Sequence, residues 1–158
     1  MIIREIKKED NAKVKEIIQD SLKSLGLAIP GTAYFDPQLN DLYHYYTNLK
    51  HANYWVVEME GEVVGGIGIA PFNEHEKICE LQKLYLTPQT QGLGFGKKLM
   101  ETALSFASKH YTKCYLETQH ELKAACKLYE KFGFTLLHEP LSGSDHSAMD
   151  AWYLTGLN

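Results

Sequence analysis

Three glycines alternate at Gly92, Gly94 and Gly96, and they open a segment whose apolar residues recur at helical spacing. The first turn of a helix has backbone N–H groups without partners and carries a partial positive charge. Glycine lets such a backbone approach a ligand closely because it has no side chain. Lys97 adds positive charge in the same turn. We therefore predict an anion-binding turn, with a phosphate as the expected ligand.

The spacing of these glycines does not fit two common nucleotide motifs. A dinucleotide-binding turn of Rossmann type requires G-x-G-x-x-G, but here the third glycine comes one residue early. A Walker A loop requires G-x-x-x-x-G-K-[ST], but Gln91 holds its first position and Lys98 its last. A helix start without a ligand is disfavoured, because each glycine inside a helix costs about 1 kcal/mol relative to alanine.

The pattern [RQ]-x-x-G-x-[GA] is filled by Gln91–Gly96, and it resembles the phosphate loop of the GNAT superfamily, the acetyl-CoA-dependent N-acetyltransferases. The preceding segment Glu80–Pro88 looks like the central strand of that family. Further along, Ala125–Phe134 resembles its A-x-x-L-Y-x-x-x-G-F motif, with every marked position filled. The resemblance follows the element order from Ile2 to Leu154 and is strongest from Ile78 to Phe134.

The resemblance implies a binding site for acetyl-CoA. In this family the pantetheine arm lies in a V-shaped cleft and pairs with the backbone of the central strand, as an added strand would. Because Gln91 stands where arginine is frequent, we expect affinity to depend mainly on the backbone amides and on Lys97. The implied coenzyme contacts are Leu84, Tyr85, Leu86, Gln91, Gly92, Leu93, Gly94, Phe95, Gly96, Lys97 and Ala125. The two leucines of the strand also suit a hydrophobic core, which is compatible with contacts through backbone.

Tyr129 matches the family tyrosine that protonates the departing thiolate of the coenzyme. A phenol with a pKa near 10 is able to give a proton to a sulfur anion and to regain it from water. From its position alone, Tyr129 would be a core residue beside Leu128 and Phe132. With the resemblance, we favour a catalytic role.

Attack on a thioester requires a neutral amine, so a general base is expected. Glu80 is the first candidate, because strand alternation predicts that Glu80, Gln82, Leu84 and Leu86 share a face. A carboxylate among apolar residues would have its pKa raised by burial. The alternative is that Glu80 is an exposed strand residue. Glu117, on the next predicted strand, is the second candidate, and proximity of amine and thioester would supply much of the rate.

The acceptor side of the family's site comes from the first two helices, their connection and the last strands. Here these are Leu27–Asp36, Tyr43–Tyr46 and Pro140–Asp150. The aromatic residues in these segments would either embrace a cation or pack together; they are Tyr34, Phe35, Tyr43, Tyr45 and Tyr46. The carboxylates able to hold an amine are Asp36, Asp145 and Asp150, and His138 and His146 flank a loop near the expected cleft mouth. No H-E-x-x-H pattern occurs, so no metal is expected.

Periodicity and turn residues predict a strand, two helices, three strands, a helix, a strand, a helix and two strands. This order favours an α/β (α+β) fold, and the resemblance makes it a GNAT-like three-layer α/β/α sandwich with a mixed, splayed central sheet. The predicted strands span residues 2–6, 54–59, 63–70, 78–86, 113–118, 135–137 and 148–154. The predicted helices span residues 11–23, 38–50, 94–109 and 121–132.

The chain has 158 residues, of which 44% are hydrophobic and 23% are charged, so we expect one domain over 1–158 with its own core. A net charge of −4 without basic clusters argues against nucleic acid as a partner. The three cysteines lack C-x-x-C spacing, which disfavours disulfides and zinc. No apolar stretch is long enough for a membrane span, and no signal peptide is recognised, so a cytoplasmic protein is expected.

These observations predict an N-acetyltransferase of bacterial type that transfers the acetyl group of acetyl-CoA to a primary amine. The acceptor would be a small molecule or a peptide, attacking directly in a ternary complex. A homodimer is compatible with the resemblance, since dimers are common in the family. Two alternatives stay open: a catalytically silent acyl-CoA-binding sensor, and a nucleotide-dependent enzyme, which the glycine spacing disfavours.

Overall fold

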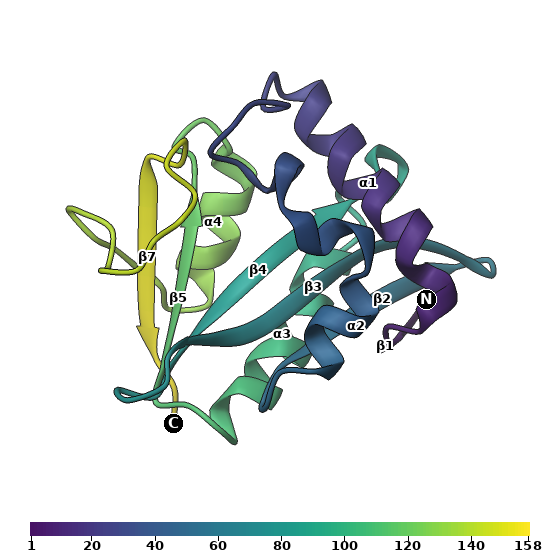
Figure 1. The fold of residues 1–158 in the computed structure, drawn as a ribbon. Coiled ribbons are helices and arrows are strands. Elements are labelled where there is room, and N and C mark those ends of the chain that lie inside the picture. The colour runs from purple at the N-terminus through teal and green to yellow at the C-terminus, as the bar shows by residue number, and fades with distance from the viewer.

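A mixed, seven-stranded sheet forms the middle layer of the computed structural model, which describes residues 1–158 (Figure 1). The strand order is β1-β2-β3-β4-β5-β7-β6. β4 and β5 are parallel, and every other neighbouring pair is antiparallel. The strands are β1 (Ile2–Glu5), β2 (Asn53–Met59), β3 (Glu62–Asn73), β4 (Ile78–Leu86), β5 (Lys113–Thr118), β6 (Thr135–Leu136) and β7 (Ala151–Gly156).

Helices cover both faces of the sheet, with α1 and α2 on one face and α3 and α4 on the other (Figure 1). A core of 20 buried residues lies on the α3 and α4 side, and a core of 14 lies on the α1 and α2 side. The α-helices are α1 (Asn11–Ser24), α2 (Leu42–Thr47), α3 (Phe95–Ser108) and α4 (Lys123–Lys131). Short 3-10 helices span Lys8–Asp10, Ala33–Phe35, Pro37–Asn40 and Pro88–Thr90. This arrangement confirms the predicted three-layer α/β/α sandwich. None of the helices combines the length and apolar character needed to cross a bilayer.

The predicted helix over residues 38–50 is wrong. The chain forms a 3-10 turn over Pro37–Asn40 and then the short helix α2. The break is at Asp41, whose φ of −157° and ψ of 72° are not helical. The Asp41 carboxylate instead accepts a hydrogen bond from the amide of His44, 3.0 Å away, and this caps the new helix.

The predicted last strand over residues 148–154 begins too early. β7 starts at Ala151, and the residues before it bond to other parts of the chain. The amide of Ala148 donates to the carbonyl of Gly31, 3.0 Å away, and that of Asp150 donates to the carbonyl of Thr118 at 3.1 Å. The first bond holds the segment before β7 against the loop that follows α1, and the second joins it to the end of β5.

A β-bulge in β4 overturns the prediction that Glu80, Gln82, Leu84 and Leu86 share one face. β4 advances three residues from Gln82 to Tyr85 while its partner β3 advances two, and Lys83 takes a left-handed φ of 52°. One extra residue reverses the alternation beyond it. Leu84 and Leu86 therefore pack on the core beneath α3, while Tyr85 packs on the core beneath α1.

β4 and β5 separate after a short paired segment. Their parallel pairing joins only Ile78–Glu80 to Lys113–Tyr115, although both strands continue beyond it. The two ribbons diverge toward their carboxyl ends, where α4 lies (Figure 1). Backbone groups on the facing edges of β4 and β5 are thus left without a partner strand, which is the splayed sheet that the resemblance implied.

Candidate active site

One cavity of about 940 Å³ lies where β4 and β5 diverge. It brings together residues from the strand, the glycine turn and α4 that are far apart in the sequence. The predicted site residues that line it are Glu80, Leu84, Tyr85, Leu86, Gln91, Gly92, Gly94, Phe95, Gly96, Lys97, Ala125 and Tyr129. Leu93 is the exception, because its side chain is 58% exposed and its amide donates to the carbonyl of Thr90.

The glycine turn before α3 presents free backbone donors to this cavity. Gly92 and Gly94 have left-handed φ values of 83° and 82°, a conformation that strains any other residue. The space beside their Cα atoms is open. No hydrogen bond within the chain is donated by the amides of Gly92, Gly94, Phe95, Gly96 and Lys97. The turn is therefore not closed by its own side chains, and its geometry suits an anion.

Lysines also line this cavity. Lys97 comes from the first turn of α3, and Lys123, Lys127 and Lys131 come from α4. The α4 lysines are four residues apart, so they lie along one helix face. This spacing was visible in the sequence, yet we predicted only Lys97. Together these lysines add positive charge to the walls of the cavity, which favours an anionic ligand.

Tyr129 is both a core residue and a cavity residue, so the two roles considered for it are compatible. Its side chain is buried between Phe134 and Tyr153, with ring centroids 6.1 Å from each. The hydrogen bonds within the chain do not involve its hydroxyl, and the residue lines the cavity. Burial raises the pKa of Tyr129 above its usual value, so the phenol stays protonated and remains a hydrogen-bond donor at physiological pH.

Glu80 is buried, which rules out the alternative of an exposed strand residue; its exposed fraction is 9%. Burial raises the pKa of Glu80 to about 7, while a hydrogen bond from Gln82 acts in the opposite direction. The Nε2 of Gln82 donates to Oε1 of Glu80 at 2.8 Å, and the hydroxyl of Tyr46 donates to Oε1 of Gln82 at 2.7 Å. A carboxyl group with this pKa is suited to general base chemistry near neutrality.

Tyr54 stabilises the β-bulge at Lys83, and glycines on β3 leave the space that the tyrosine ring occupies. The hydroxyl of Tyr54 donates to the carbonyl of Lys83 at 2.9 Å. A Cβ at Gly66 would lie 2.4 Å from the Tyr54 ring, and one at Gly68 would lie 2.6 Å from the Tyr46 hydroxyl. The sequence signal was the Gly65-Gly66-Ile67-Gly68 run inside an apolar strand, which marks a close approach of other groups to the backbone.

A buried ion pair joins β4 to the loop after α1. The Nζ of Lys83 lies 2.8 Å from Oδ2 of Asp36, and Nε2 of His146 lies 3.0 Å from the same oxygen. Burial acts to raise the pKa of Asp36, but His146 and Lys83 outweigh it, so the pKa is lowered. The hydrogen bond with Asp36 raises the pKa of His146 against the effect of burial. These three residues bring β4 and two distant loops together beside the cavity, which Lys83 and His146 line.

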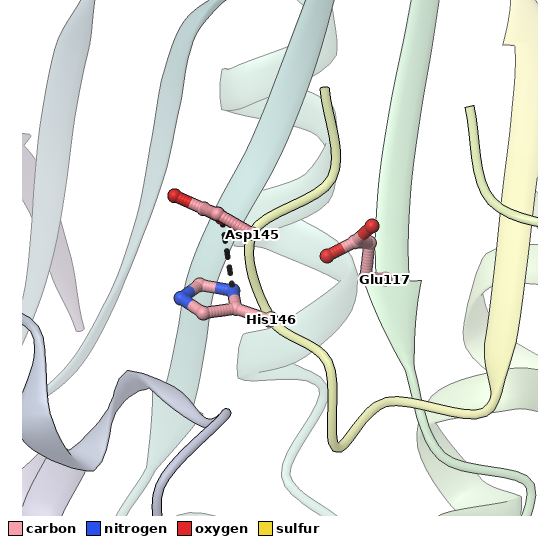
Figure 2. A group of neighbouring side chains, drawn as sticks. All are labelled: Glu117, Asp145 and His146. Carbon is pink, nitrogen blue, oxygen red and sulfur yellow. Dashed lines mark ion pairs between the residues drawn. The ribbon is translucent and has the colours of Figure 1, made fainter. Parts of the chain in front are cut away.

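His146 lies beside two further carboxylates, Glu117 on β5 and Asp145 on the same loop (Figure 2). One ligand atom from each of the three residues lies within 4.8 Å of the others. The Asp145 side chain is 81% exposed, and its Oδ1 is 4.0 Å from Nδ1 of His146. Glu117 lines the large cavity with Glu80, so both candidate bases predicted from the sequence face the same space.

The segments predicted for the acceptor side are only partly at the cavity. Leu27, Ala33, His146 and Met149 line it, and a smaller cavity of about 400 Å³ lies between Asp36, Asp145 and their neighbours. The aromatic residues form separate pairs, Tyr34 with Phe35 and Tyr45 with Tyr46, whose centroids are 5.1 and 4.9 Å apart. Asp150 accepts a hydrogen bond from the amide of His120 and lines neither cavity.

The cavity combines free backbone amides, a splayed strand pair, a buried carboxyl group and a tyrosine, as expected for the class of acyl-CoA-dependent transferases. A profile of the Acetyltransferase (GNAT) family matches residues 17–134. The chain therefore belongs to the GNAT family and is an acyltransferase. Members of this family use acetyl-CoA and act on amine acceptors.

Particular relatives agree with this assignment. The uncharacterized N-acetyltransferase YjgM of Escherichia coli is 43% identical over 148 residues, which cover 92% of this chain and 88% of that protein. The N-acetylaspartate synthetase of Xenopus tropicalis is 33% identical over 117 residues, covering 71% of this chain and 43% of that protein. The chain thus spans less than half of that synthetase.

Solved structures share the fold. A GNAT-family acetyltransferase from Staphylococcus aureus has a TM-score of 0.87 at 21% identity, with 99% of each chain covered. A putative acetyltransferase from Salmonella typhimurium, solved with acetyl-CoA, has a TM-score of 0.79 at 22% identity and covers 100% of this chain and 94% of its own. A spermidine N-acetyltransferase from Vibrio cholerae, in complex with CoA and spermine, has a TM-score of 0.73 at 19% identity over 98% and 94%.

Proposed function

We propose that this protein transfers the acetyl group of acetyl-CoA to a primary amine of a small molecule or peptide, by direct attack in a ternary complex. The observation that carries this proposal is the cavity that joins the free amides of Gly92 and Gly94–Lys97 to Glu80 and Tyr129. The residues present fit the coenzyme, since backbone donors and lysines suit its diphosphate and the unpaired edge of β4 suits its peptide-like arm.

In this proposal the coenzyme supplies the activated acetyl group, and the protein positions it and moves protons. The turn at Gly92–Gly96 binds the diphosphate, and the backbone of Leu84–Leu86 binds the pantetheine arm. Glu80, with a pKa of about 7, accepts a proton from the incoming amine. Tyr129 donates a hydrogen bond to the departing thiolate and passes it a proton; water then restores the proton of Tyr129 and takes up the one held by Glu80.

Two measurements test the proposal. Isothermal titration calorimetry should show that acetyl-CoA binds and that NAD does not. Thiol release should depend on an added amine, and Tyr129→Phe should lower kcat at least about tenfold while coenzyme affinity stays within about twofold. Binding of acetyl-CoA without turnover across an amine panel would instead favour the alternative, a catalytically silent sensor. Tighter binding of NAD would contradict the whole proposal.

The resemblance also leads us to propose a cytoplasmic enzyme that is able to form a homodimer. Cell fractionation and analytical ultracentrifugation test these two statements separately from the chemistry. In this proposal the lysines of the cavity bind the diphosphate of the coenzyme. They therefore do not indicate a nucleic-acid site, and nucleic acid is not proposed as a partner. The net charge of −4 supports this choice.

A further inference from the structure

Glu117 has a carboxylate oxygen that nothing in the chain satisfies. Its Oε1 is buried and has no hydrogen-bond partner. Its Oε2 accepts from the hydroxyl of Tyr115 at 2.8 Å, and that hydroxyl accepts from the amide of Leu141 at 3.2 Å. The carboxylate is therefore fixed by one oxygen while the other is left without a donor. Such an arrangement is costly unless a ligand supplies the missing donor.

No cationic nitrogen of the protein forms an ion pair with Glu117, and the second nitrogen of His146, Nδ1, lies 4.0 Å from Oδ1 of Asp145. The Nζ of Lys83 and Nε2 of His146 are both engaged by Asp36. Figure 2 shows the Glu117 carboxylate across from the loop that carries Asp145 and His146. The position next to Oε1 of Glu117 therefore requires a donor from outside the chain.

The offset of Glu117 from Glu80 indicates how far apart the donor groups of such a ligand must be. Tyr115 is the register partner of Glu80 across the parallel β4–β5 pair, and Glu117 follows two residues later on the same face of β5. Glu117 is therefore about 7 Å further along β5, toward the end where the strands diverge. Both carboxylates line the large cavity, and Glu80 is nine-tenths buried with no partner for its second oxygen.

We propose that Glu117 determines acceptor specificity, because its Oε1 binds a second ammonium group of the acceptor while the amine to be acetylated lies at Glu80. The preferred acceptor is then an aliphatic diamine. This inference rests on the proposed acetyl-transfer function. A carboxylate in place of the second ammonium group would be repelled by Glu80 and Glu117. Lys83 would not offset this repulsion, because Asp36 already neutralises it.

A divalent metal ion is the alternative cation for this cluster, because Glu117, Asp145 and His146 offer ligand atoms within 4.8 Å of one another. A metal requires a neutral imidazole nitrogen. The hydrogen bond with Asp36 raises the pKa of His146 and so favours the charged form, and Asp145 is 81% exposed. These observations favour an ammonium group over a metal ion.

The test compares 1-aminobutane with 1,4-diaminobutane, which differ only in the second ammonium group. Thiol release at saturating acetyl-CoA gives kcat/KM for each amine. We expect the wild type to prefer the diamine at least about tenfold, and Glu117→Gln to lower the ratio of diamine to monoamine kcat/KM about 10- to 100-fold. Glutamine keeps an oxygen for the Tyr115 hydroxyl, and a thermal melt within a few degrees of wild type verifies folding. Glu74→Gln, an exposed residue of the β3–β4 hairpin, is the matched control.

An unchanged diamine preference in Glu117→Gln, or a wild type that prefers the monoamine, would overturn the assignment. Loss of diamine turnover on chelation with EDTA, restored by Zn²⁺, would overturn it in favour of a metal site. Turnover of monoamines without a diamine preference refutes this inference alone. Absence of turnover with every amine despite bound acetyl-CoA refutes the proposed acetyl transfer itself.

Discussion

Replacing Glu80 with glutamine gives a direct test of the general base. Burial raises the pKa of Glu80 to about 7, so its ionised fraction rises from about 10% at pH 6 to about 90% at pH 8. Glutamine has the same shape and cannot accept a proton. The ratio of wild-type to Glu80→Gln kcat/KM should therefore rise roughly ninefold between pH 6 and pH 8, and reach at least about 100 at the plateau.

The ratio is the informative quantity, because ionisation of the free amine affects both enzymes equally and cancels. The assay follows thiol release at saturating acetyl-CoA, with coenzyme affinity measured in parallel by calorimetry. Glu74→Gln serves as the control for a lost charge at an exposed position. A ratio that stays flat from pH 6 to pH 8, or a Glu80→Gln enzyme with full activity, would refute the reasoning.

The same carboxyl group should affect stability. Because its folded pKa is raised from 4.5 to about 7, the folded protein holds this proton more tightly than the unfolded chain. The resulting stabilisation is fully present below about pH 4.5 and is lost as the pH rises through 7. At about 1.4 kcal/mol per pKa unit, the penalty above pH 7 is at most about 4 kcal/mol. Glu80→Gln should accordingly raise Tm at pH 8 and change it little at pH 4.5, whereas an equal change at both pH values would contradict the burial argument.

Two glycine substitutions separate binding from folding. Gly94→Ala places a side chain at a φ of 82° with open space around it, so we expect a stability loss of about 1–2 kcal/mol and weaker acetyl-CoA binding, measured by thermal melts and calorimetry. Unchanged coenzyme affinity in Gly94→Ala would contradict the anion-binding turn. Gly66→Ala places a Cβ 2.4 Å from the Tyr54 ring, so it should destabilise the fold by about 1–3 kcal/mol in chemical denaturation. A loss below about 0.5 kcal/mol would show that Tyr54 moves freely and does not hold the bulge.

Local sequence patterns were sufficient to predict most of the helices and the glycine turn of this protein. Periodic apolar residues predicted α1, α3 and α4, and the turn at Gly92–Gly96 predicted the free amides before α3. These features depend on residues close in the chain, so their spacing carries the information. The break at Asp41 was missed because hydrophobic periodicity does not distinguish two kinds of polar residue. One caps a new helix, as Asp41 does, and the other is exposed on a continuous helix.

What only the tertiary structure decided is which distant groups meet. The bulge at Lys83 depends on the space left by Gly66 and on the hydroxyl of Tyr54, so no pattern within β4 indicated that alternation reverses there. The pKa of Glu80 depends on burial created by other elements, and the unsatisfied oxygen of Glu117 exists only once β5 and the loop at His146 are packed. Sequence spacing specifies which reactive groups a segment carries. Their pKa values and hydrogen-bond partners depend on burial and pairing, which arise from contacts between segments that are distant in the sequence.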